Sequence, residues 1–154
     1  MTTIGIDPGA SGGIALHYGE GLVTTLSMPD SVAGLREFFS SVLRSPFTSA
    51  PVAFIEDVPK FVRVIPGSAV AVLFRNFGRI EGVLSGLGIP YRLVRPQDWQ
   101  KPLALTTTRS ACKTSGQWKN ILKAEAQLRF PGVPVTLKTA DALLILDYGK
   151  RQIV

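Results

Sequence analysis

The chain has 154 residues, of which 45% are hydrophobic, and this is enough to bury the core of one domain over residues 1–154. The net charge is +6, from 17 Lys and Arg against 11 Asp and Glu. No apolar run is long enough to cross a bilayer and no targeting segment is expected, so we predict a cytoplasmic protein without a membrane partner. The single cysteine, Cys112, excludes an internal disulfide and fits a reducing compartment.

The first expected strand, residues 2–6, ends in an acid. Pro8-Gly9 stops the strand directly after Asp7, so this carboxylate stands at the end of an apolar run. Burial of the carboxylate is costly unless a cation compensates its charge. From these residues alone, capping of the Pro-Gly turn explains the presence of Asp7 equally well.

Two further strands are expected at 14–18 and 22–28, which completes an antiparallel meander, and an amphipathic helix follows at 30–45. The next apolar run also ends in acid, at Glu56. Because a strand after a crossover helix pairs parallel with the strand before it, we expect Glu56 to lie beside Asp7 at one edge of the sheet.

Residues 58–67 have no clear period and are expected to form a loop. The helix that follows, 68–87, carries Gly78, Gly82 and Gly86, which recur every four residues and leave one stripe of the helix without side chains. Each glycine costs about 1 kcal/mol of helix propensity, so close packing should offset this cost. The packing partner is either the sheet of the same chain or the same helix of a second copy.

A short strand is expected at 89–94, then a polar segment at 101–116 that we predict to be a mobile loop, and then helices at 117–129 and about 138–150. The apolar side of the first of these helices is expected to hold Trp118, Ile121, Leu122 and Leu128. This order of elements predicts an α/β fold of the ribonuclease H-like kind. Its mixed five-stranded sheet has three antiparallel strands, then two parallel ones, with helices on both faces.

A third acid, Asp141, lies in the first turn of the last expected helix. The helix dipole favours a carboxylate there by about 0.3–1 kcal/mol, which is a purely structural reason for its presence. If Asp7, Glu56 and Asp141 converge, their repulsion requires a cation, and oxygen ligands without Cys or His select Mg²⁺ or Mn²⁺. Such a site suits phosphodiester hydrolysis, since one ion lowers the pKa of the attacking water and another stabilises the leaving 3′ oxygen.

The middle of the chain is strongly basic, which predicts a polyanionic partner, most simply nucleic acid. Only Glu81 and Asp98 oppose eleven basic residues in this region. These residues are Lys60, Arg63, Arg75, Arg79, Arg92, Arg95, Lys101, Arg109, Lys113, Lys119 and Lys123. A solvated basic surface is the alternative, and charge alone does not exclude it.

Over nearly its whole length, and in the same order, the chain resembles RuvC-type Holliday junction resolvases. The motifs that carry the resemblance are IGIDPG at 4–9, IEDV at 55–58 and ADALLI at 140–145. PQDWQK at 96–101 and FPG at 130–132 are similar to the phage and organellar branch. The resemblance implies an enzyme of DNA recombination and repair in the cytoplasm of a bacterial or phage-infected cell. It would be a homodimer, formed through the helix with the glycine stripe, that nicks two opposed strands of a four-way DNA junction with a divalent metal.

The resemblance also assigns residues. Asp7, Glu56 and Asp141 match the metal-binding acids, and Phe61 is similar to the aromatic that stacks into the opened junction, a contact worth about 1–3 kcal/mol. Packing of Phe61 against the core is the alternative. Lys119 is our choice for the basic catalytic residue near the scissile phosphate, although the register also allows Lys113 or Lys123. The expected DNA contacts are Phe61, Lys60, Arg63, Arg75, Lys101, Lys113 and Lys123.

The chain departs from the family at Lys138. RuvC-type enzymes usually carry Asp or His three positions before the last acid, but the ammonium of Lys138 cannot ligate a metal. On a helix it would share a face with Asp141. We expect Lys138 to contact the scissile phosphate or to replace part of the charge of a second ion, whereas a surface lysine paired with Asp141 is the alternative. Binding of two metals is therefore in question.

Three other functions compete with a resolvase, because a fold does not determine a substrate. The first is a ribonuclease H-like nuclease for another branched or hybrid nucleic acid. The second is a non-catalytic structural protein that binds junctions, and Lys138 is its main support. The third is an actin-like ATPase domain, which the glycine-rich turn after Asp7 favours and the short chain disfavours.

Overall fold

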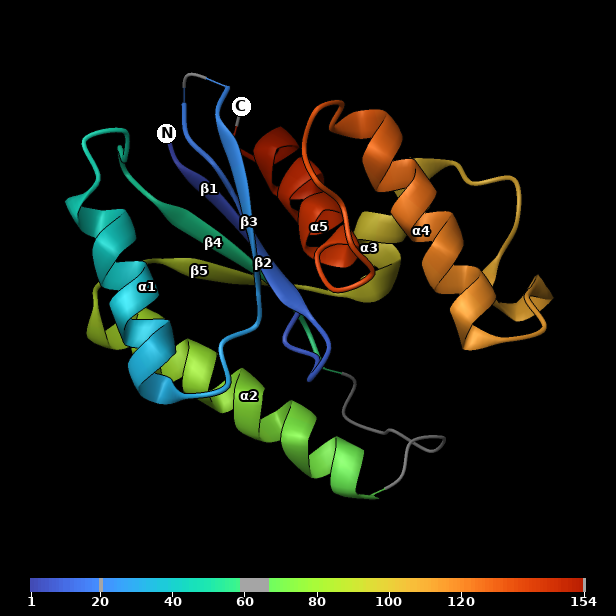
Figure 1. The fold of residues 1–154 in the computed structure, drawn as a ribbon, viewed down its shortest axis with the longest axis horizontal. Helices are drawn as coiled ribbons and strands as arrows, with labels where there is room; N and C mark the ends of the chain where they lie inside the picture. The colour runs from blue at the N-terminus through green and yellow to red at the C-terminus, as the bar shows by residue number, and fades with distance from the viewer. Residues whose placement is uncertain (20, 59–66, 154) are drawn as a thin grey trace.

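A mixed sheet of five strands in the order β3-β2-β1-β4-β5 forms the centre of the fold (Figure 1). The structure is a computed structural model and describes residues 1–19, 21–58 and 67–153. The strands are β1 (Thr3–Ile6), β2 (Gly13–His17), β3 (Val23–Ser27), β4 (Val52–Glu56) and β5 (Tyr91–Val94). The pairs β1–β2 and β2–β3 are antiparallel, whereas β1–β4 and β4–β5 are parallel. The expected ribonuclease H-like sheet is therefore confirmed.

Helices cover both faces of the sheet, as expected (Figure 1). One face carries α1 (Val32–Arg44) and α2 (Gly67–Gly86), and the other carries α3 (Pro96–Gln100), α4 (Ser115–Arg129) and α5 (Ala140–Arg151). Successive residues of a strand point to opposite faces, so the sheet separates two apolar cores. Among the described residues, no helix combines the length and the apolar character needed to cross a membrane.

Glycines let α5 lie directly on the centre of the sheet. A Cβ at Gly5 of β1 would overlap the backbone of Ala142 and Leu146, and a Cβ at Gly149 would overlap the ring of Phe54. The side chains of residues 142–146 are fully buried, because the sheet covers one side of α5, and α3 and α4 pack against α5 as well. The first turn of α5 is thereby held at the end of β1 where the chain leaves the strand.

A chain of ion pairs joins the end of α4 to the middle of α5. Arg129 Nε lies 2.6 Å from Glu125 Oε1, and Arg129 Nη1 lies 2.8 Å from Asp147 Oδ2. Arg151 on the last turn of α5 pairs with the same Asp147 oxygen at 2.5 Å. Because the Arg129 side chain is only 22% exposed, salt screens this network less than it screens a surface pair.

The start of α5 differs from the expectation. The helix begins at Ala140 and Thr139 is its N-cap residue, so Lys138 lies in the turn before the helix. Hydroxyl groups explain the late start, because the backbone N–H of Thr136 donates to Thr139 Oγ1 and that of Lys138 donates to Thr136 Oγ1. Such bonds compete with helical ones. The idea that Lys138 and Asp141 share one face of a helix is wrong.

Two other expectations need correction. Leu128 of α4 is 78% exposed, because the buried side of this helix repeats every four residues at Trp118, Leu122 and Ala126. The expected loop at 101–116 instead contains the 3-10 helices Lys101–Leu103 and Arg109–Ala111. The side chain of Leu103 is buried and anchors the first of them in the core.

Candidate metal centre

Asp7 and Glu56 follow neighbouring residues of two parallel strands. Ile6 of β1 is paired with Ile55 of β4. The residue that follows each of them therefore brings a carboxyl group to the same edge of the sheet. Hydrogen bonds also fix the backbone at Asp7 and directly after Glu56. The N–H of Asp7 donates to Gly13 O at 3.0 Å, and the N–H of Asp57 donates to Val94 O at 2.8 Å. The two acids therefore lie side by side on a rigid support.

The turn after β1 wraps around the Asp7 side chain. The backbone N–H of Gly9 donates to Asp7 Oδ1 at 2.9 Å, and a Cβ at Gly12 would lie 2.8 Å from Asp7 Cγ. Asp7 thus caps the Pro-Gly turn, which is one of the two explanations that the sequence offered for an acid at this position. Burial outweighs this hydrogen bond and the charge of Lys119, so that the pKa of Asp7 is raised above its usual 3.8.

Asp141 reaches the same place from α5, since α5 begins over the end of β1. Burial, and then the charge of Asp7, raise the pKa of Asp141 to about 7, while Lys119 and Arg109 oppose the rise. Burial is also the largest cause that raises the pKa of Glu56, to about 8, followed by the charges of the other two acids. Each of the three carboxyl groups therefore lies within electrostatic reach of at least one other.

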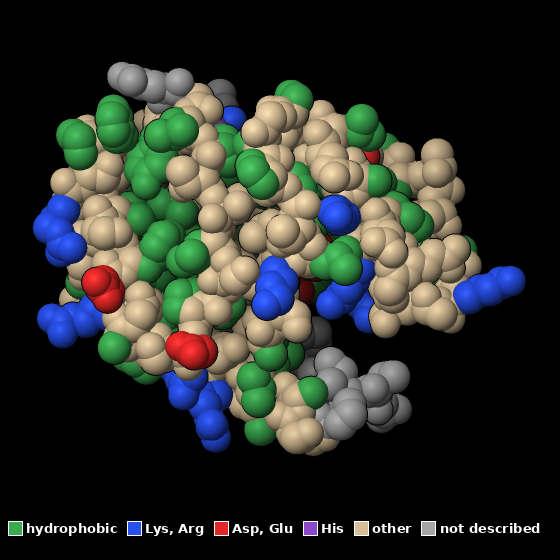
Figure 2. Space-filling view, in the orientation of Figure 1, with side chains coloured by type: hydrophobic (Ala, Val, Ile, Leu, Met, Phe, Trp, Pro, Cys, Tyr) green, Lys and Arg blue, Asp and Glu red, His purple; other side chains and the backbone are tan. Residues whose placement is uncertain are grey.

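Glu56 and Asp141 border a cleft of about 210 Å³, which we call the acid cleft, and the Asp7 carboxyl group is buried within electrostatic reach of both. Lys119 and Arg109 are the cations that line the cleft. Figure 2 shows the hollow, with red carboxylate atoms deep between blue Lys and Arg side chains. The other lining residues are Leu73, Pro96, Gln100, Ser115, Trp118 and Leu122.

The donor set of the acid cleft fits a hard divalent cation. Carboxylate oxygens are the ligands of Mg²⁺ and Mn²⁺, and a cation would relieve the repulsion that raises the pKa of each acid. Within residues 1–19, 21–58 and 67–153, no three His, Cys, Asp or Glu side chains form a ready-made cluster of metal ligands. Mg²⁺ does not need one, because it is usually bound by one or two carboxylates together with waters and substrate phosphates.

Two solved structures share this arrangement of elements. T. thermophilus RuvC in complex with a Holliday junction substrate has a TM-score of 0.59 and 18% identity, over 99% of this chain and 96% of that chain. The Thermus thermophilus RuvC structure has a TM-score of 0.55 and 19% identity over the same shares. The chain has the RuvC fold. No protein-family model and no curated protein matches the sequence, so the likeness to RuvC is one of fold.

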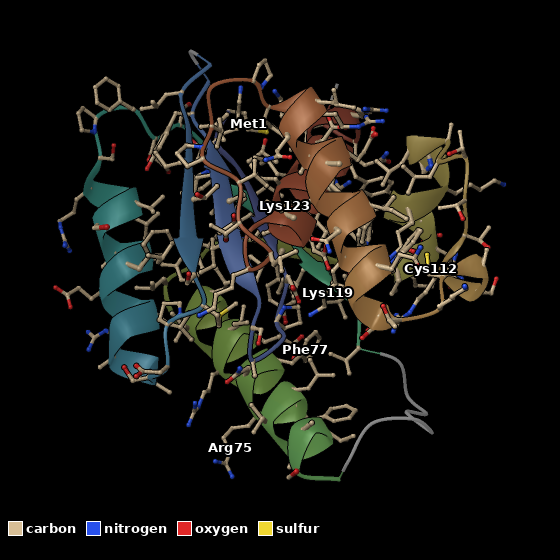
Figure 3. All side chains as sticks on the ribbon, turned by 45° about the vertical axis from the view of Figure 1, so that its right-hand side comes forward. Met1, Arg75, Phe77, Cys112, Lys119 and Lys123 are labelled. Carbon is tan, nitrogen blue, oxygen red and sulfur yellow. The ribbon has the colours of Figure 1, made fainter. Side chains whose placement is uncertain are left out.

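In this RuvC fold, the basic residues expected from sequence fall into two groups. Lys119 and Lys123 extend from α4 on the side of the acid cleft (Figure 3), and Lys101 lines an adjoining hollow of about 320 Å³ with Arg109. Lys113 is exposed just before α4. By contrast, Arg75 extends from α2 into solvent (Figure 3). Lys60, Phe61 and Arg63 lie outside the described residues.

Sequence reasoning missed two residues that lie next to the acids. Arg109 stood out only as one of eleven basic residues, because its approach to the acids depends on the 3-10 helix at 109–111. Trp99 is the second, and its indole Nε1–H donates to Glu56 Oε2 at 2.9 Å. No local pattern in the sequence could have found Trp99, because its burial beside Glu56 depends on packing against distant parts of the chain.

Proposed function

We propose that the protein is a metal-dependent, structure-selective endonuclease that resolves four-way DNA junctions by paired, symmetric nicks. The convergence of Asp7, Glu56 and Asp141 on a cleft lined by Lys119 and Arg109 carries this proposal. The RuvC fold supports it, since one of the two similar structures is that of RuvC in complex with a Holliday junction substrate. A basic protein with a net charge of +6 also suits a DNA partner.

Asp7, Glu56 and Asp141 would hold Mg²⁺ or Mn²⁺. When bound, such an ion supplies a water of lowered pKa and a positive charge for the leaving oxygen. Residues of the protein bind the DNA and hold the acids in place. Lys119 and Arg109 attract the DNA phosphate to the acids and balance its charge. The Gly9 N–H holds the Asp7 carboxylate in place at 2.9 Å, so its geometry is fixed before the substrate arrives.

Lys138 and the remaining basic residues would position the DNA. Lys138 is exposed in the turn before α5, and its carbonyl lies against β2, so that a Cβ at Gly13 would be 2.6 Å from Lys138 O. A lysine anchored at its backbone but free at its ammonium can contact a phosphate near Asp141. Further contacts would come from basic residues near the cleft, from Arg75 on α2, and from the segment around Phe61, which would stack into the opened junction. These are Lys60, Phe61, Arg63, Arg75, Lys101, Lys113 and Lys123.

A homodimer formed through α2 would place two acid clefts on one junction. Within the part of the chain that the structure describes, Cβ atoms built at Gly78, Gly82 and Gly86 meet nothing within 4 Å, so packing of this stripe on the sheet of the same chain is wrong. The three glycines line a groove of about 350 Å³ beside Val32 and Arg36 of α1. A helix of a second copy would find room there for close backbone contact.

A cleavage assay on a four-way junction with Mg²⁺ or Mn²⁺ tests the proposal. We expect the wild type to introduce symmetric nicks in two opposed strands. Asp7→Asn and Glu56→Gln keep the shape of each side chain but remove its charge, so they should bind the junction and leave it uncut. Glu37→Gln is the matched control, because Glu37 is an exposed residue of α1 on the far face of the sheet.

Two other outcomes would contradict the proposal. Preferred cleavage of RNA–DNA hybrids or flaps would make the protein a different nuclease of the same fold. A wild type that binds the junction and leaves it intact at every divalent-ion concentration would make it a structural junction-binding protein.

A further inference from the structure

The indole of Trp99 is locked in the core behind the acid cleft. Trp99 is the fourth residue of α3, and its side chain is only 1% exposed. It belongs to the same apolar core as Val94, Leu103 and Leu144. Because both χ angles of a packed tryptophan are fixed by its neighbours, its N–H points in one direction. That N–H donates to Glu56 Oε2 at 2.9 Å.

The backbone explains how Trp99 returns to Glu56. Glu56 is paired with Val94 in the sheet, and α3 begins two residues after Val94. One helical turn then carries the chain back over the end of β4. Arg95 braces this turn, since its Nε and Nη2 donate to both Asp98 carboxylate oxygens at 2.9 and 2.8 Å. The position of the indole is therefore set by the sheet rather than by a loop.

Glu56 needs such a partner. Its flexible side chain is repelled by the charges of Asp7 and Asp141, and without a fixed donor it would turn away from them. An indole N–H only donates, so it favours a carboxylate oxygen that accepts. It occupies one oxygen and leaves Oε1 of Glu56 for another bond.

We propose that Trp99 is a positioning residue that fixes Glu56 Oε2 and thereby presents Oε1 to a divalent cation in the acid cleft. The inference rests on the proposed function in one respect, namely that Glu56 is a metal ligand. It assigns to the buried tryptophan of the PQDWQK segment a role in metal affinity rather than in packing alone.

Trp99→Phe tests the inference, because it keeps an aromatic ring and removes the donor. Mn²⁺ affinity is measured by calorimetry or by electron paramagnetic resonance on the full chain without DNA. Loss of a hydrogen-bond partner of a metal ligand typically weakens metal binding 10- to 100-fold, so we expect at least about a 10-fold loss. Junction affinity without a divalent ion should stay within about two-fold of the wild type, since Trp99 is buried and touches no DNA.

Trp118→Phe is the matched control. Trp118 lines the acid cleft and is 7% exposed, but among the described residues its indole donates no hydrogen bond to an acid. The same chemical change there should leave Mn²⁺ affinity as in the wild type. Wild-type Mn²⁺ affinity in Trp99→Phe, or an equal loss in both variants, would overturn the inference.

A measurement on Trp118→Phe covers the case in which Trp99→Phe fails to fold. The chain has two tryptophans, so Trp118→Phe retains one indole N–H resonance, that of Trp99. We expect Mg²⁺ to shift this resonance in a saturable way, and Glu56→Gln to abolish the shift. A resonance that saturating Mg²⁺ leaves unmoved would refute the role of Trp99. A wild type that binds Mn²⁺ without cutting junctions would remove the proposed function only, whereas one that binds no divalent ion would remove both.

Discussion

Glu56 and Asp141 retain protons at a pH where exposed carboxyl groups have lost them. Burial is the main cause in both, and the repulsion between neighbouring acids adds to it. At neutral pH a divalent cation must therefore compete with protons for the acid cleft. Without the cation, the ionised acids destabilise the fold, because their charges are buried together.

The stability of the metal-free protein should fall as pH rises from about 4 to about 8. In this window the native state holds protons that the unfolded state has released, since the pKa of Glu56 is raised from 4.5 to about 8. One pKa unit corresponds to about 1.4 kcal/mol, so we expect a total loss on the order of a few kcal/mol. Thermal unfolding at several pH values in EDTA measures it.

Glu56→Gln isolates the contribution of Glu56 from that of His17, whose pKa burial lowers. This variant should flatten the decline, and Mg²⁺ added to the wild type at pH 8 should reverse it. A pH profile identical in the wild type and in Glu56→Gln would show that Glu56 is ionised without penalty.

Lys138→Ala should reduce the cleavage rate about 100-fold with little change in junction affinity, if the ammonium meets the scissile phosphate as charge develops on it. Single-turnover cleavage and a binding titration separate the two effects. Lys150→Ala is the control, because Lys150 lies in the last turn of α5, at the end away from Asp141. An unchanged rate would reduce Lys138 to a surface lysine.

At the scale of elements, the contact between α5 and β1 decides where Asp141 lies. Gly5→Ala should destabilise the protein by about 1–3 kcal/mol, since its Cβ would overlap the backbone of Ala142 and Leu146 and backbone cannot rotate away. It should also weaken Mn²⁺ binding, as the first turn of α5 shifts. Chemical denaturation and calorimetry measure both effects.

Gly116→Ala is the comparison for Gly5→Ala. Among the described residues its Cβ would meet only Thr114 Oγ1, at 3.9 Å, and alanine favours a helix over glycine by about 1 kcal/mol. We expect this variant to be as stable as the wild type or more so. Equal stability of the two alanine variants would mean that α5 can move away from β1 at no cost.

The sequence predicted those elements that local patterns determine. Apolar runs that end in acid identified β1 and β4, and the crossover rule placed Glu56 beside Asp7, as the strand pairing confirms. The start of α5 was wrong because the hydroxyls of Thr136 and Thr139 outweigh helical propensity.

The short helix α3 and the approach of Arg109 could not be predicted, because both depend on contacts with distant parts of the chain. Trp99 becomes buried only when α5 packs against it, and no local pattern in PQDWQK predicts that contact. The same holds for the glycine stripe of α2. Its exposure is a property of the folded chain. The spacing of the glycines alone allowed packing either on the sheet of the same chain or on a second copy.

At the scale of the whole molecule, paired cleavage requires two coupled acid clefts. Gly82→Leu should fold, since no described residue lies within 4 Å of a Cβ at this position, but it should fill the groove and abolish the proposed dimer. Light scattering after gel filtration measures the oligomeric state. On a cruciform plasmid, the variant should give nicked circles in place of linear DNA, because the two cuts lose their coupling.

Ala124→Leu adds the same bulk on α4, on the other face of the sheet, and should leave the dimer intact. A dimer that survives Gly82→Leu would exclude the glycine stripe as the interface.

The ion pair between Arg129 and Asp147 has a consequence for the geometry of the acid cleft. It ties α4 to α5 ten residues beyond Lys119, which is about 15 Å along the helix. We expect any tilt of α4 to be smallest at this pair and to grow along the helix toward Lys119. A tilt of a few degrees at the pair displaces the lysine by about 1 Å at the cleft, a distance that suffices to change a reaction rate by about two orders of magnitude.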